Sequence, residues 1–385
     1  MTYAGNRRII DVDSHLFELD DFLHSAALGE EAVFIRPMEA QTELPVSLEA
    51  INRGREHLDR RNVDPEVMAK FEESMFDISR SPWSRLGAFD PTERSHALDV
   101  LGFERQIVFG TFSFHQIAHE VDAKALEIGA RVYNRAMGHF CAHDERLLAG
   151  GYVPFSLGPD IAGALLDEAF DDGCFTVMVD TNEADPKARS FTHPDFDPLW
   201  ARFTERNVPM VLHIAVNGHY DPVSPSFKNN GRDSTALGGD APDTSLGLVA
   251  MHNSVEMFLS AMIFDEVFER HDGLRCLSLE HGASWVPGWL HKLDFVERSM
   301  HPVAPRSRLA SDVARERVRF APFAGEPIDW LIEQLGPDML CFASDYPHPE
   351  GSSDPIRKFE ATMDGVDPTA AEAFYAGNVE HFLGF

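Results

Sequence analysis

The chain has 385 residues, of which 44% are hydrophobic, 10% aromatic and 25% charged. This composition is close to the globular average and excludes a disordered or collagen-like chain. The formal net charge of -30, from 63 acidic and 33 basic residues, argues against nucleic acid or an anionic membrane as a partner, because both bind basic surfaces. One large domain or two ordinary ones would fit this length, and we predict a single domain over residues 1–385.

The N-terminal sequence MTYAGNRRIID has no apolar stretch before its first charged residues, so we expect no signal peptide. No window approaches 18 uninterrupted apolar residues, which argues against a membrane-spanning helix. The four cysteines form no CxxC pair, which disfavours a zinc ribbon or a disulfide framework. These features predict a cytoplasmic protein.

Eight short apolar runs recur along the chain and have the length and composition of buried strands. They are RRIIDV near the N-terminus and, by residue number, 105–110, 148–155, 174–180, 209–216, 274–281, 317–323 and 339–345. The segments between them carry apolar residues three or four positions apart, as amphipathic helices do. The clearest are DAKALEIGARVYNRAMGHFC, DIAGALLDEAF, DPLWARFTERN, SLGLVAMHNSVEMFLSAMIFDEVFER, VPGWLHKLDFVERSM and PIDWLIEQLG.

Strands of this kind, alternating with helices, predict a parallel sheet covered on both faces. Eight strands in one cycle favour an α/β fold of the (β/α)8 TIM barrel type, for which the chain length is ordinary. An open doubly wound sheet is the alternative, and it would need a glycine-rich phosphate turn after the first strand. The turn here is DVDSHLFE, which contains no glycine.

Two connections are too long for simple loops. The interval of about residues 19–101 is rich in Glu, Arg and Pro, and we predict a helical insertion after strand 1 that covers the mouth of the barrel. A second segment, about residues 217–245, follows the fifth strand and is dense in Gly, Pro, Ser and Asp. We predict that it forms a mobile flap.

The stretch IIDVDSHLFE places Asp11, Asp13 and His15 at every second position. On a strand, residues two apart share a face, so these groups would form one polar row. Burying such a row costs several kcal/mol unless the groups are hydrogen-bonded or neutralised. A cation would neutralise it. Asp11 lies deeper in the strand and is better explained as a structural hydrogen-bonding group than as a ligand.

More groups of this chemistry lie at predicted strand ends, where the functional loops of a (β/α)8 barrel gather. Besides Asp13 and His15, they are His213 late in strand 5, Glu280 and His281 at the end of strand 6, and Asp345 at the end of strand 8. Imidazoles together with carboxylates suit Zn, Mn, Fe or Co rather than Ca or Mg. Taken singly, His213 fits a core histidine and Asp345 fits a turn or helix cap equally well.

The pattern resembles the amidohydrolase-related family, in the branch that includes aminocarboxymuconate-semialdehyde decarboxylase and the dihydroxybenzoate decarboxylases. The matching segments span nearly the whole chain. They are IDVDSHLFE, HPDFDPLWARFTERNVPMVLHIA, LEHGASWVPGWLHKLD and FASDYPHPEG.

The resemblance implies roles for five residues. Asp13 and His15 fill the positions of the family's first metal pair, and His213 resembles the ligand from strand 5. Asp345 resembles the aspartate that binds the metal and takes a proton from its water. His281 resembles the histidine that orients or deprotonates this water. The implied cofactor is a divalent transition metal, Zn, Mn or Fe.

Two departures from the family pattern bear on the metal. Aspartate at position 13, where hydrolases of the superfamily commonly have histidine, adds charge and favours Mn or Fe over Zn. Glu18 could reach the same cavity as a further ligand, or could instead bind backbone amides at a helix start. The strand-4 run CFTVMVD lacks the lysine that often holds a second metal, so a second ion would need Glu18, His281 or His348.

Other histidines are candidates for contacts with a substrate or with the ligands. His115 and His119 lie four apart in FHQIAHE, but Gln116 stands where the zincin motif needs Glu, so a metalloprotease is rejected. His115 follows strand 2 and could line the pocket. His219 in the flap and His348 in DYPHPEG are similar candidates.

The leading prediction is a metal-dependent enzyme that hydrolyses or decarboxylates a small carboxylate- or amide-bearing substrate, with a slight preference for hydrolysis. The first alternative is a dinuclear non-haem iron oxygenase (Fe/Fe or Fe/Mn) on the same barrel. The second is a non-catalytic structural partner of an active paralogue. We expect a homo-oligomer or a complex with a paralogue, by analogy with similar barrels.

Overall fold

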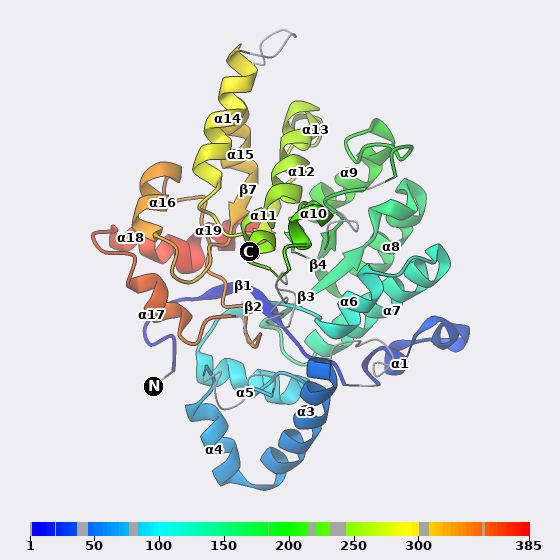
Figure 1. The fold of residues 1–385 in the computed structure, drawn as a ribbon. Helices are drawn as coiled ribbons and strands as arrows, with labels where there is room; N and C mark the ends of the chain where they lie inside the picture. The colour runs from blue at the N-terminus through cyan, green and yellow to red at the C-terminus, as the bar shows by residue number, and fades with distance from the viewer. Residues whose placement is uncertain are drawn as a thin grey trace.

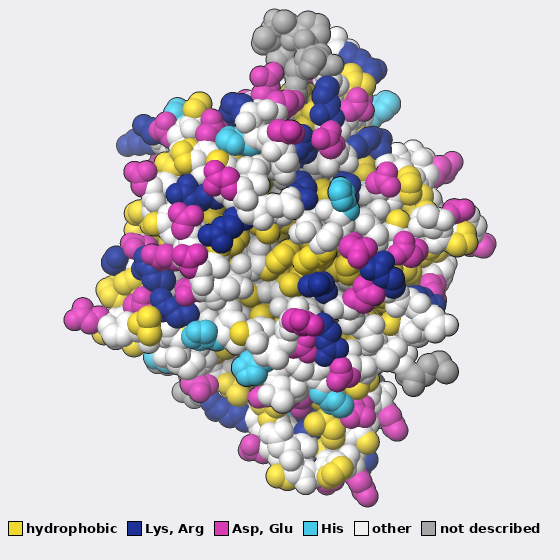
Figure 2. All heavy atoms as spheres, turned by 180° about the vertical axis from the view of Figure 1, so that it is seen from behind, with side chains coloured by type: hydrophobic (Ala, Val, Ile, Leu, Met, Phe, Trp, Pro, Cys, Tyr) yellow, Lys and Arg dark blue, Asp and Glu magenta, His cyan; other side chains and the backbone are white. Residues whose placement is uncertain are grey.

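In the computed structural model, parallel strands lie at the centre and helices surround them (Figure 1). Acidic and basic side chains are interspersed over the face drawn in Figure 2, as expected for a solvated surface. The described residues are 2–19, 21–36, 45–76, 84–183, 185–214, 216, 221–231, 244–299, 308–348 and 351–385.

In the part of the chain that the structure describes, seven strands form one all-parallel sheet in chain order, which confirms the predicted parallel α/β architecture. Each strand pairs with the next, and the intervening segments contain helices, as crossover connections between parallel strands usually do. The strands are β1 (Ile10–His15), β2 (Arg105–Phe109), β3 (Leu147–Val153), β4 (Cys174–Val179), β5 (Met210–His213), β6 (Cys276–Leu279) and β7 (Val318–Phe320).

Within the described residues no named strand follows β7, so the eighth predicted strand, residues 339–345, is not a regular strand. Two isolated parallel bridges, Phe320 with Leu340 and Ser14 with Tyr346, still place this segment between β7 and β1. Its amides explain the irregularity. The Phe342 amide donates to the Phe374 carbonyl oxygen instead of to a neighbouring strand.

Within the described residues, five helical segments lie between β1 and β2. They are α1 (Phe22–Ala26), the 3-10 helix η1 (Gly29–Phe34), α3 (Pro45–Val63), α4 (Pro65–Glu73) and α5 (Pro91–Leu101), of which α3, α4 and α5 lie together below the sheet in Figure 1. A buried ion pair joins two of them, because the Arg61 guanidinium in α3 donates to both carboxylate oxygens of Glu93 in α5. That these helices form a lid stays a prediction.

Buried Arg94 connects α5 to the first strand. Its guanidinium donates to the carbonyl oxygen of His15 at 2.9 Å, to the hydroxyl of Ser14 at 2.9 Å and to the side-chain oxygen of Gln106 at 3.2 Å. A buried guanidinium is tolerated only when its donors are satisfied in this way. The position of α5 is therefore tied to the end of β1.

Each of the clearest amphipathic segments predicted from the sequence contains a helix in the structure. For example, α7 begins after Asp122, whose carboxylate accepts hydrogen bonds from the amides of Lys124 and Ala125. The helices that follow β2 in the described residues are α6 (Phe112–Ala118), α7 (Ala123–Cys141), η2 (Phe155–Leu157), α8 (Pro159–Asp171), η3 (Pro194–Phe196), α9 (Asp197–Arg206), α10 (Pro225–Lys228), α11 (Ser245–Ala250), α12 (Asn253–Phe264), α13 (Val267–Arg270), α14 (Val286–Ser299), α15 (Ala310–Arg317), α16 (Ile328–Leu335), α17 (Pro355–Glu360), α18 (Pro368–Glu372), the π-helix η4 (Ala373–Gly377) and α19 (Asn378–Leu383).

One segment, Ser245–Phe264, is long and apolar enough to cross a membrane by length and composition alone, contrary to the expectation from the sequence. It comprises α11 and α12, and α12 buries apolar residues such as Val255, Leu259 and Met262. Core helices of globular proteins pass the same test, so this is weak evidence for a membrane span.

Part of the predicted flap, residues 217–220 and 232–243, lies outside the described residues. Its described part contains the short helix α10. All four cysteines are buried and free, which agrees with the absence of a disulfide framework in the sequence.

Candidate metal centre

The carboxyl ends of the strands bring together side chains from distant parts of the sequence. All six residues of β1 are buried, and Asp13 and His15 share one face of it because they are two positions apart. His213 is the last residue of β5, and Glu280 directly follows β6. Because parallel strands end at the same edge, these four side chains meet at one end of the sheet.

Asp13, His15, His213 and Glu280 each offer one ligand atom to a group in which all these atoms lie within 4.8 Å of one another. Asp13 Oδ1 lies 3.4 Å from the Nε2 atoms of both His15 and His213. Glu280 Oε2 lies 3.6 Å from His213 Nε2. Metal–donor bonds of about 2.0–2.2 Å at tetrahedral or octahedral angles separate neighbouring donors by about 3.0–3.6 Å. The observed spacing is therefore that of ligands around one cation.

The tautomer of His213 also fits a metal. Its Nδ1 lies 2.9 Å from the carbonyl oxygen of Ile214, which can only accept a hydrogen bond. Nδ1 therefore carries a ring proton, which leaves Nε2, 3.4 Å from Asp13 Oδ1, as the ring nitrogen that could bind a metal. A ligand histidine commonly has its other nitrogen hydrogen-bonded in this way.

A second group of the same kind overlaps the first. It consists of His15, Glu280, Asp345 and His348, again with ligand atoms within 4.8 Å of one another. His348 Nδ1 lies 2.9 Å from Asp345 Oδ1 and 4.0 Å from Glu280 Oε1, and His15 Nε2 lies 3.7 Å from Asp345 Oδ1. Asp345, predicted to share an ion with Asp13, belongs to this second group and not to the first.

A hydrogen-bond chain sets the orientation of His348. The Thr111 hydroxyl donates its one proton to the Leu16 carbonyl oxygen at 2.9 Å, so it accepts from His348 Nε2 at 2.8 Å. Nδ1, 2.9 Å from Asp345 Oδ1, is then the ring nitrogen that faces the ligand group. A ligand histidine commonly has its other nitrogen hydrogen-bonded in this way.

The backbone is strained at two of these residues. Glu280 has φ of 57° and Asp345 has φ of 54°, both in the left-handed region that glycine prefers. For residues with a Cβ this costs about 1 kcal/mol or more and is typical of functional sites. At both positions the turn directs a carboxylate into the cluster.

The surroundings of Asp13 also shift the pKa of its carboxyl group. Burial raises the pKa of its carboxyl, but the facing imidazoles of His213 and His15 outweigh this and hold the pKa well below its usual range. Asp13 is therefore ionised at neutral pH, as a metal ligand must be.

Asp11 has the structural role that its position predicts. Its carboxylate accepts hydrogen bonds from the side-chain amide of Gln106 at 2.8 Å and from the amide and hydroxyl of Ser344 at 2.8 and 2.6 Å. Burial raises the pKa of Asp11 to about 7 despite these bonds. The contact with Ser344 attaches the irregular eighth segment to β1.

His281, predicted as a catalytic base or ligand, is buried next to Glu280 but belongs to neither ligand group. Its Nδ1 lies 3.2 Å from the hydroxyl of Ser278. Burial lowers the pKa of His281 to about 3, with a further contribution from His213, so its ring is neutral. Its role in the chemistry stays a prediction.

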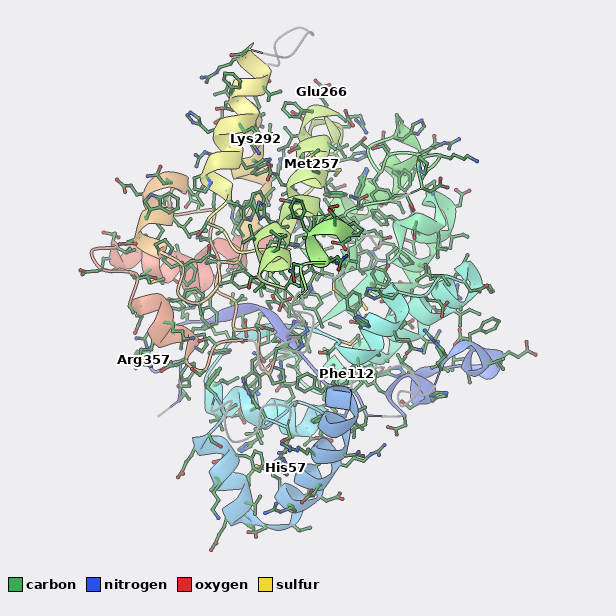
Figure 3. All side chains as sticks on the ribbon, in the orientation of Figure 1. His57, Phe112, Met257, Glu266, Lys292 and Arg357 are labelled. Carbon is green, nitrogen blue, oxygen red and sulfur yellow. The ribbon has the colours of Figure 1, made fainter. Side chains whose placement is uncertain are left out.

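Glu18, the other predicted ligand, lies at the start of α6. Its carboxylate accepts hydrogen bonds from the amides of Thr111 and Phe112, each at 2.8 Å, and from the hydroxyl of Ser113. Phe112, labelled in Figure 3 above α3, packs in one apolar cluster with Ile51 of that helix. Glu18 therefore binds backbone amides at the start of a helix, as the alternative interpretation of the sequence predicts, and it belongs to neither ligand group.

The three histidines predicted to contact a substrate have different positions. His348 is fully buried within the second ligand group. His115 is exposed on α6, where its ring stacks on His119 at 4.1 Å. His219 lies outside the described residues.

Of the two consecutive candidates at the end of strand 6, the family resemblance gives a role to His281, whereas the structure places Glu280 in both ligand groups. A signal was available, because a glutamate that directly follows a buried strand of a barrel is at the functional edge. Which of two consecutive residues faces the site depends on the backbone turn at Glu280.

Comparisons with known proteins agree with this architecture. Among solved structures, an amidohydrolase from Mycobacterium avium subsp. paratuberculosis K-10 is 20% identical, with a TM-score of 0.72 over 99% of this chain and 98% of that one. A 2,6-dihydroxybenzoate decarboxylase from Rhizobium is 16% identical, with a TM-score of 0.64 over 98% of each chain.

A 5-carboxyvanillate decarboxylase from Novosphingobium aromaticivorans DSM 12444, solved with manganese and 4-hydroxy-3-methoxy-5-nitrobenzoic acid, is 17% identical. Its TM-score is 0.63 over 99% of this chain and 97% of that one. At these identities the likeness shows a common fold.

No match was found among functionally curated proteins. The family model described as Amidohydrolase matches residues 10–385, which confirms the resemblance inferred from the motifs. The chain belongs to the amidohydrolase family.

Proposed function

We propose that this protein is a metal-dependent enzyme that hydrolyses or decarboxylates a small carboxylate- or amide-bearing substrate. The observation that carries the proposal is the buried ligand group of Asp13, His15, His213 and Glu280, with donor spacings that suit one cation. Membership of the amidohydrolase family is consistent with this chemistry.

We also propose that the sheet is a (β/α)8 barrel whose eighth position is the irregular segment before Asp345. Backbone hydrogen bonds support this on both sides of the segment. The Cys341 amide donates to the Phe320 carbonyl oxygen of β7, and the Asp345 amide donates to the Asp13 carbonyl oxygen of β1. The helices between β1 and β2 would then lie as a lid beside the site, because Arg94 fixes α5 to the end of β1.

The proposed cation is a divalent transition metal, and its donor set of imidazoles and carboxylates suits Mn or Fe as well as Zn. The manganese of the 5-carboxyvanillate decarboxylase favours Mn among these. When bound, such an ion lowers the pKa of a coordinated water and polarises a carbonyl or carboxylate group of the substrate.

The residues beside the cation would handle the proton. Asp345 Oδ1 lies at the edge of the ligand group, 3.7 Å from His15 Nε2, with an oxygen that can accept a proton. His348 Nδ1 lies 2.9 Å from this oxygen, and the hydrogen bond to Thr111 fixes the orientation of the His348 ring. His281, directly after Glu280 in the chain, would contribute a neutral ring.

We propose the substrate class of this protein from two solved structures that share its fold. The Rhizobium and Novosphingobium enzymes are named as decarboxylases of aromatic carboxylates. We therefore propose two reactions to test, which are decarboxylation of a hydroxylated aromatic acid and hydrolysis of a small amide or ester. The oxygenase and structural-partner alternatives, the oligomeric state and the cytoplasmic location stay predictions.

The test uses the full chain, stripped of metal with a chelator and reloaded with Mn, Zn, Fe or Co singly. CO2 release from hydroxybenzoates and hydrolysis of small amides and esters are measured for each form. Turnover should vanish on stripping and return with one of the ions. His213→Ala should lower kcat/KM more than about 100-fold, because a direct ligand is worth at least as much as the groups that support one.

His271→Ala is the matched control. His271 is a half-buried histidine whose Nε2 lies 3.1 Å from Asp197 Oδ1, and it belongs to neither ligand group. This variant should keep its turnover. Equal turnover of the stripped and reloaded protein on a substrate from these classes would show that the proposal is wrong.

A further inference from the structure

The turn after β6 is held by a carboxylate from the next loop of the sheet. Glu326 lies between β7 and α16, and its Oε1 accepts a hydrogen bond from the amide of Ser284 at 2.8 Å. The hydroxyl of Ser284 donates to the same oxygen. Oε2 accepts from the amide of Ala283 at 3.0 Å and from the amide of Phe323 at 2.7 Å. Hydrogen bonds to a charged acceptor are among the stronger ones in proteins, so Glu326 joins the two loops firmly.

The turn held in this way is the one that carries Glu280. Three residues separate the end of β6, at Leu279, from the held amide of Ala283, and Glu280 is the first of them. The strand end is fixed as well, because Leu279 pairs with His213 of β5. Both ends of a three-residue turn are therefore anchored, which leaves its backbone little freedom to redirect the Glu280 side chain.

The backbone of this turn is strained at two positions. Glu280 has φ of 57° and Gly282 has φ of 64°, both in the left-handed region. A residue with a Cβ stays in this region only where the surrounding structure requires it. Glu326 supplies such a requirement, because release of the Ala283 amide would let Glu280 relax to a right-handed φ. The Glu280 carboxylate, which offers an atom to both ligand groups, would then turn away from them.

The loop that carries Glu326 is itself fixed against β6. The Ala321 amide donates to the carbonyl oxygen of Ser278 in β6 at 3.0 Å. The two loops also approach closely, since a Cβ at Gly282 would lie 3.0 Å from the Phe323 ring and 3.1 Å from Glu326 Oε2. The Glu326 carboxylate therefore has a defined position and can impose a conformation on the turn that it holds.

Capping of α14 is the alternative role for Glu326. This helix begins at Val286, directly after the turn, and a carboxylate near a helix N-terminus stabilises the helix. Capping alone predicts a loss of stability without a change in metal binding. Asp294 offers a comparison, because its carboxylate accepts the amide of Ser311 at 3.1 Å and the hydroxyl of Ser311 at 2.9 Å, and it belongs to neither ligand group.

We propose that Glu326 is a positioning residue that directs the Glu280 carboxylate into the metal centre. This rests on the proposed function, in which Glu280 is one of the ligands of the cation. Glu326 acts through the backbone of the turn, so its effect on metal binding should disappear when the Glu280 carboxylate is removed. Groups that orient ligands typically account for about 10- to 100-fold in metal affinity.

The experiment measures the dissociation constant of the metal-stripped full chain for Mn, by competition with a chelating dye, and Tm in chelator. Glu326→Gln should raise the dissociation constant by about tenfold or more, because the nitrogen of a glutamine side chain cannot accept the hydrogen bonds that the carboxylate accepts. Asp294→Asn is the matched control. It should lower Tm and leave the dissociation constant within about twofold of the wild-type value.

A double-mutant cycle tests whether Glu326 acts through Glu280. Glu280→Gln removes the carboxylate that is positioned. Addition of Glu326→Gln to this variant should therefore change the Mn dissociation constant by less than about twofold. Two independent roles would instead multiply the two effects. None of these measurements depends on turnover.

A wild-type dissociation constant in Glu326→Gln would overturn this inference and leave the proposed function intact if turnover of the wild type needs metal. Effects that multiply in the double variant would also overturn it. Turnover that metal stripping leaves unchanged would refute the proposed function itself.

Ser284→Ala decides the question if Glu326→Gln does not fold, because it removes only the hydroxyl that donates to Glu326. Its Mn dissociation constant should rise by about threefold, since one hydrogen bond contributes less than a whole carboxylate. An unchanged dissociation constant in this variant would overturn the inference.

Discussion

Glu280→Gln should have opposite effects on stability in the metal-free and the Mn-loaded protein. The carboxylates of Glu280 and Asp345 have oxygens within 4.8 Å of each other. At this distance, and an effective dielectric constant of about 20, two negative charges repel by about 3.5 kcal/mol. The facing imidazoles offset part of this repulsion. Without metal, the substitution should therefore raise the free energy of unfolding by about 1–3 kcal/mol.

With metal bound, the sign should reverse. Ligand binding stabilises the folded state by an amount that grows with affinity, and each tenfold loss of affinity removes about 1.4 kcal/mol. Loss of this carboxylate from the ligand group should therefore lower the stability of the Mn-loaded protein by about 1–3 kcal/mol.

The assay is thermal unfolding of the wild type and Glu280→Gln, each in chelator and in excess MnCl2. For a chain of 385 residues, 1 kcal/mol corresponds to a Tm shift of about 1 °C. The shifts should be positive in chelator and negative in Mn. Ser278→Ala, which removes a buried hydroxyl on the same strand end, is the control and should shift Tm in the same direction in both conditions. The reasoning would be refuted if Glu280→Gln lowered Tm equally with and without Mn.

Three further outcomes follow from contacts outside the metal centre. Arg61→Ala leaves the Glu93 carboxylate buried without its guanidinium and should cost about 3–5 kcal/mol in urea unfolding, and a loss below 1 kcal/mol would contradict this. Arg146 holds the pKa of Asp144 at about 2, below its unfolded value, so this stabilisation is present above about pH 4 and is lost as the pH falls toward 2. The stability gap between the wild type and Asp144→Asn should therefore narrow from pH 5 to pH 3 in urea titrations, whereas a constant gap would exclude the pairing as its cause. Trp200→Ala removes a fully buried ring and should cost about 3–5 kcal/mol, whereas a midpoint equal to that of wild type would show that the core closes around the cavity.

The sequence predicted the parts of the site that depend on strand geometry. Asp13 and His15 share a face because the period of a strand is two, and His213 terminates a strand that its apolar neighbours make recognisable. The seven named strands were predicted as apolar runs for the same reason, because buried parallel strands are apolar on both faces.

Features that depend on contacts between distant segments could not be predicted in this way. Glu18 binds the amides at the start of α6, more than ninety positions further along the chain, which no local pattern indicates. The positive φ at Glu280 decides that this residue, and not His281, faces the ligand group. The eighth segment has the composition of a strand, but the Phe342 and Ser344 amides donate to the Phe374 carbonyl oxygen and the Asp11 carboxylate instead of to a ladder.

The attachment of Ser344 to Asp11 has a consequence for biosynthesis. The first strand leaves the ribosome long before the residues that complete its pairing. During most of translation its acidic side chains therefore lack the partners that surround them in the folded protein. Chains truncated before residue 344 would lack this closing contact and would display an open sheet edge, which is a substrate for chaperones and proteases. Synthesis of residues 339–346 is therefore the step that lets the nascent protein close the open edge of its sheet.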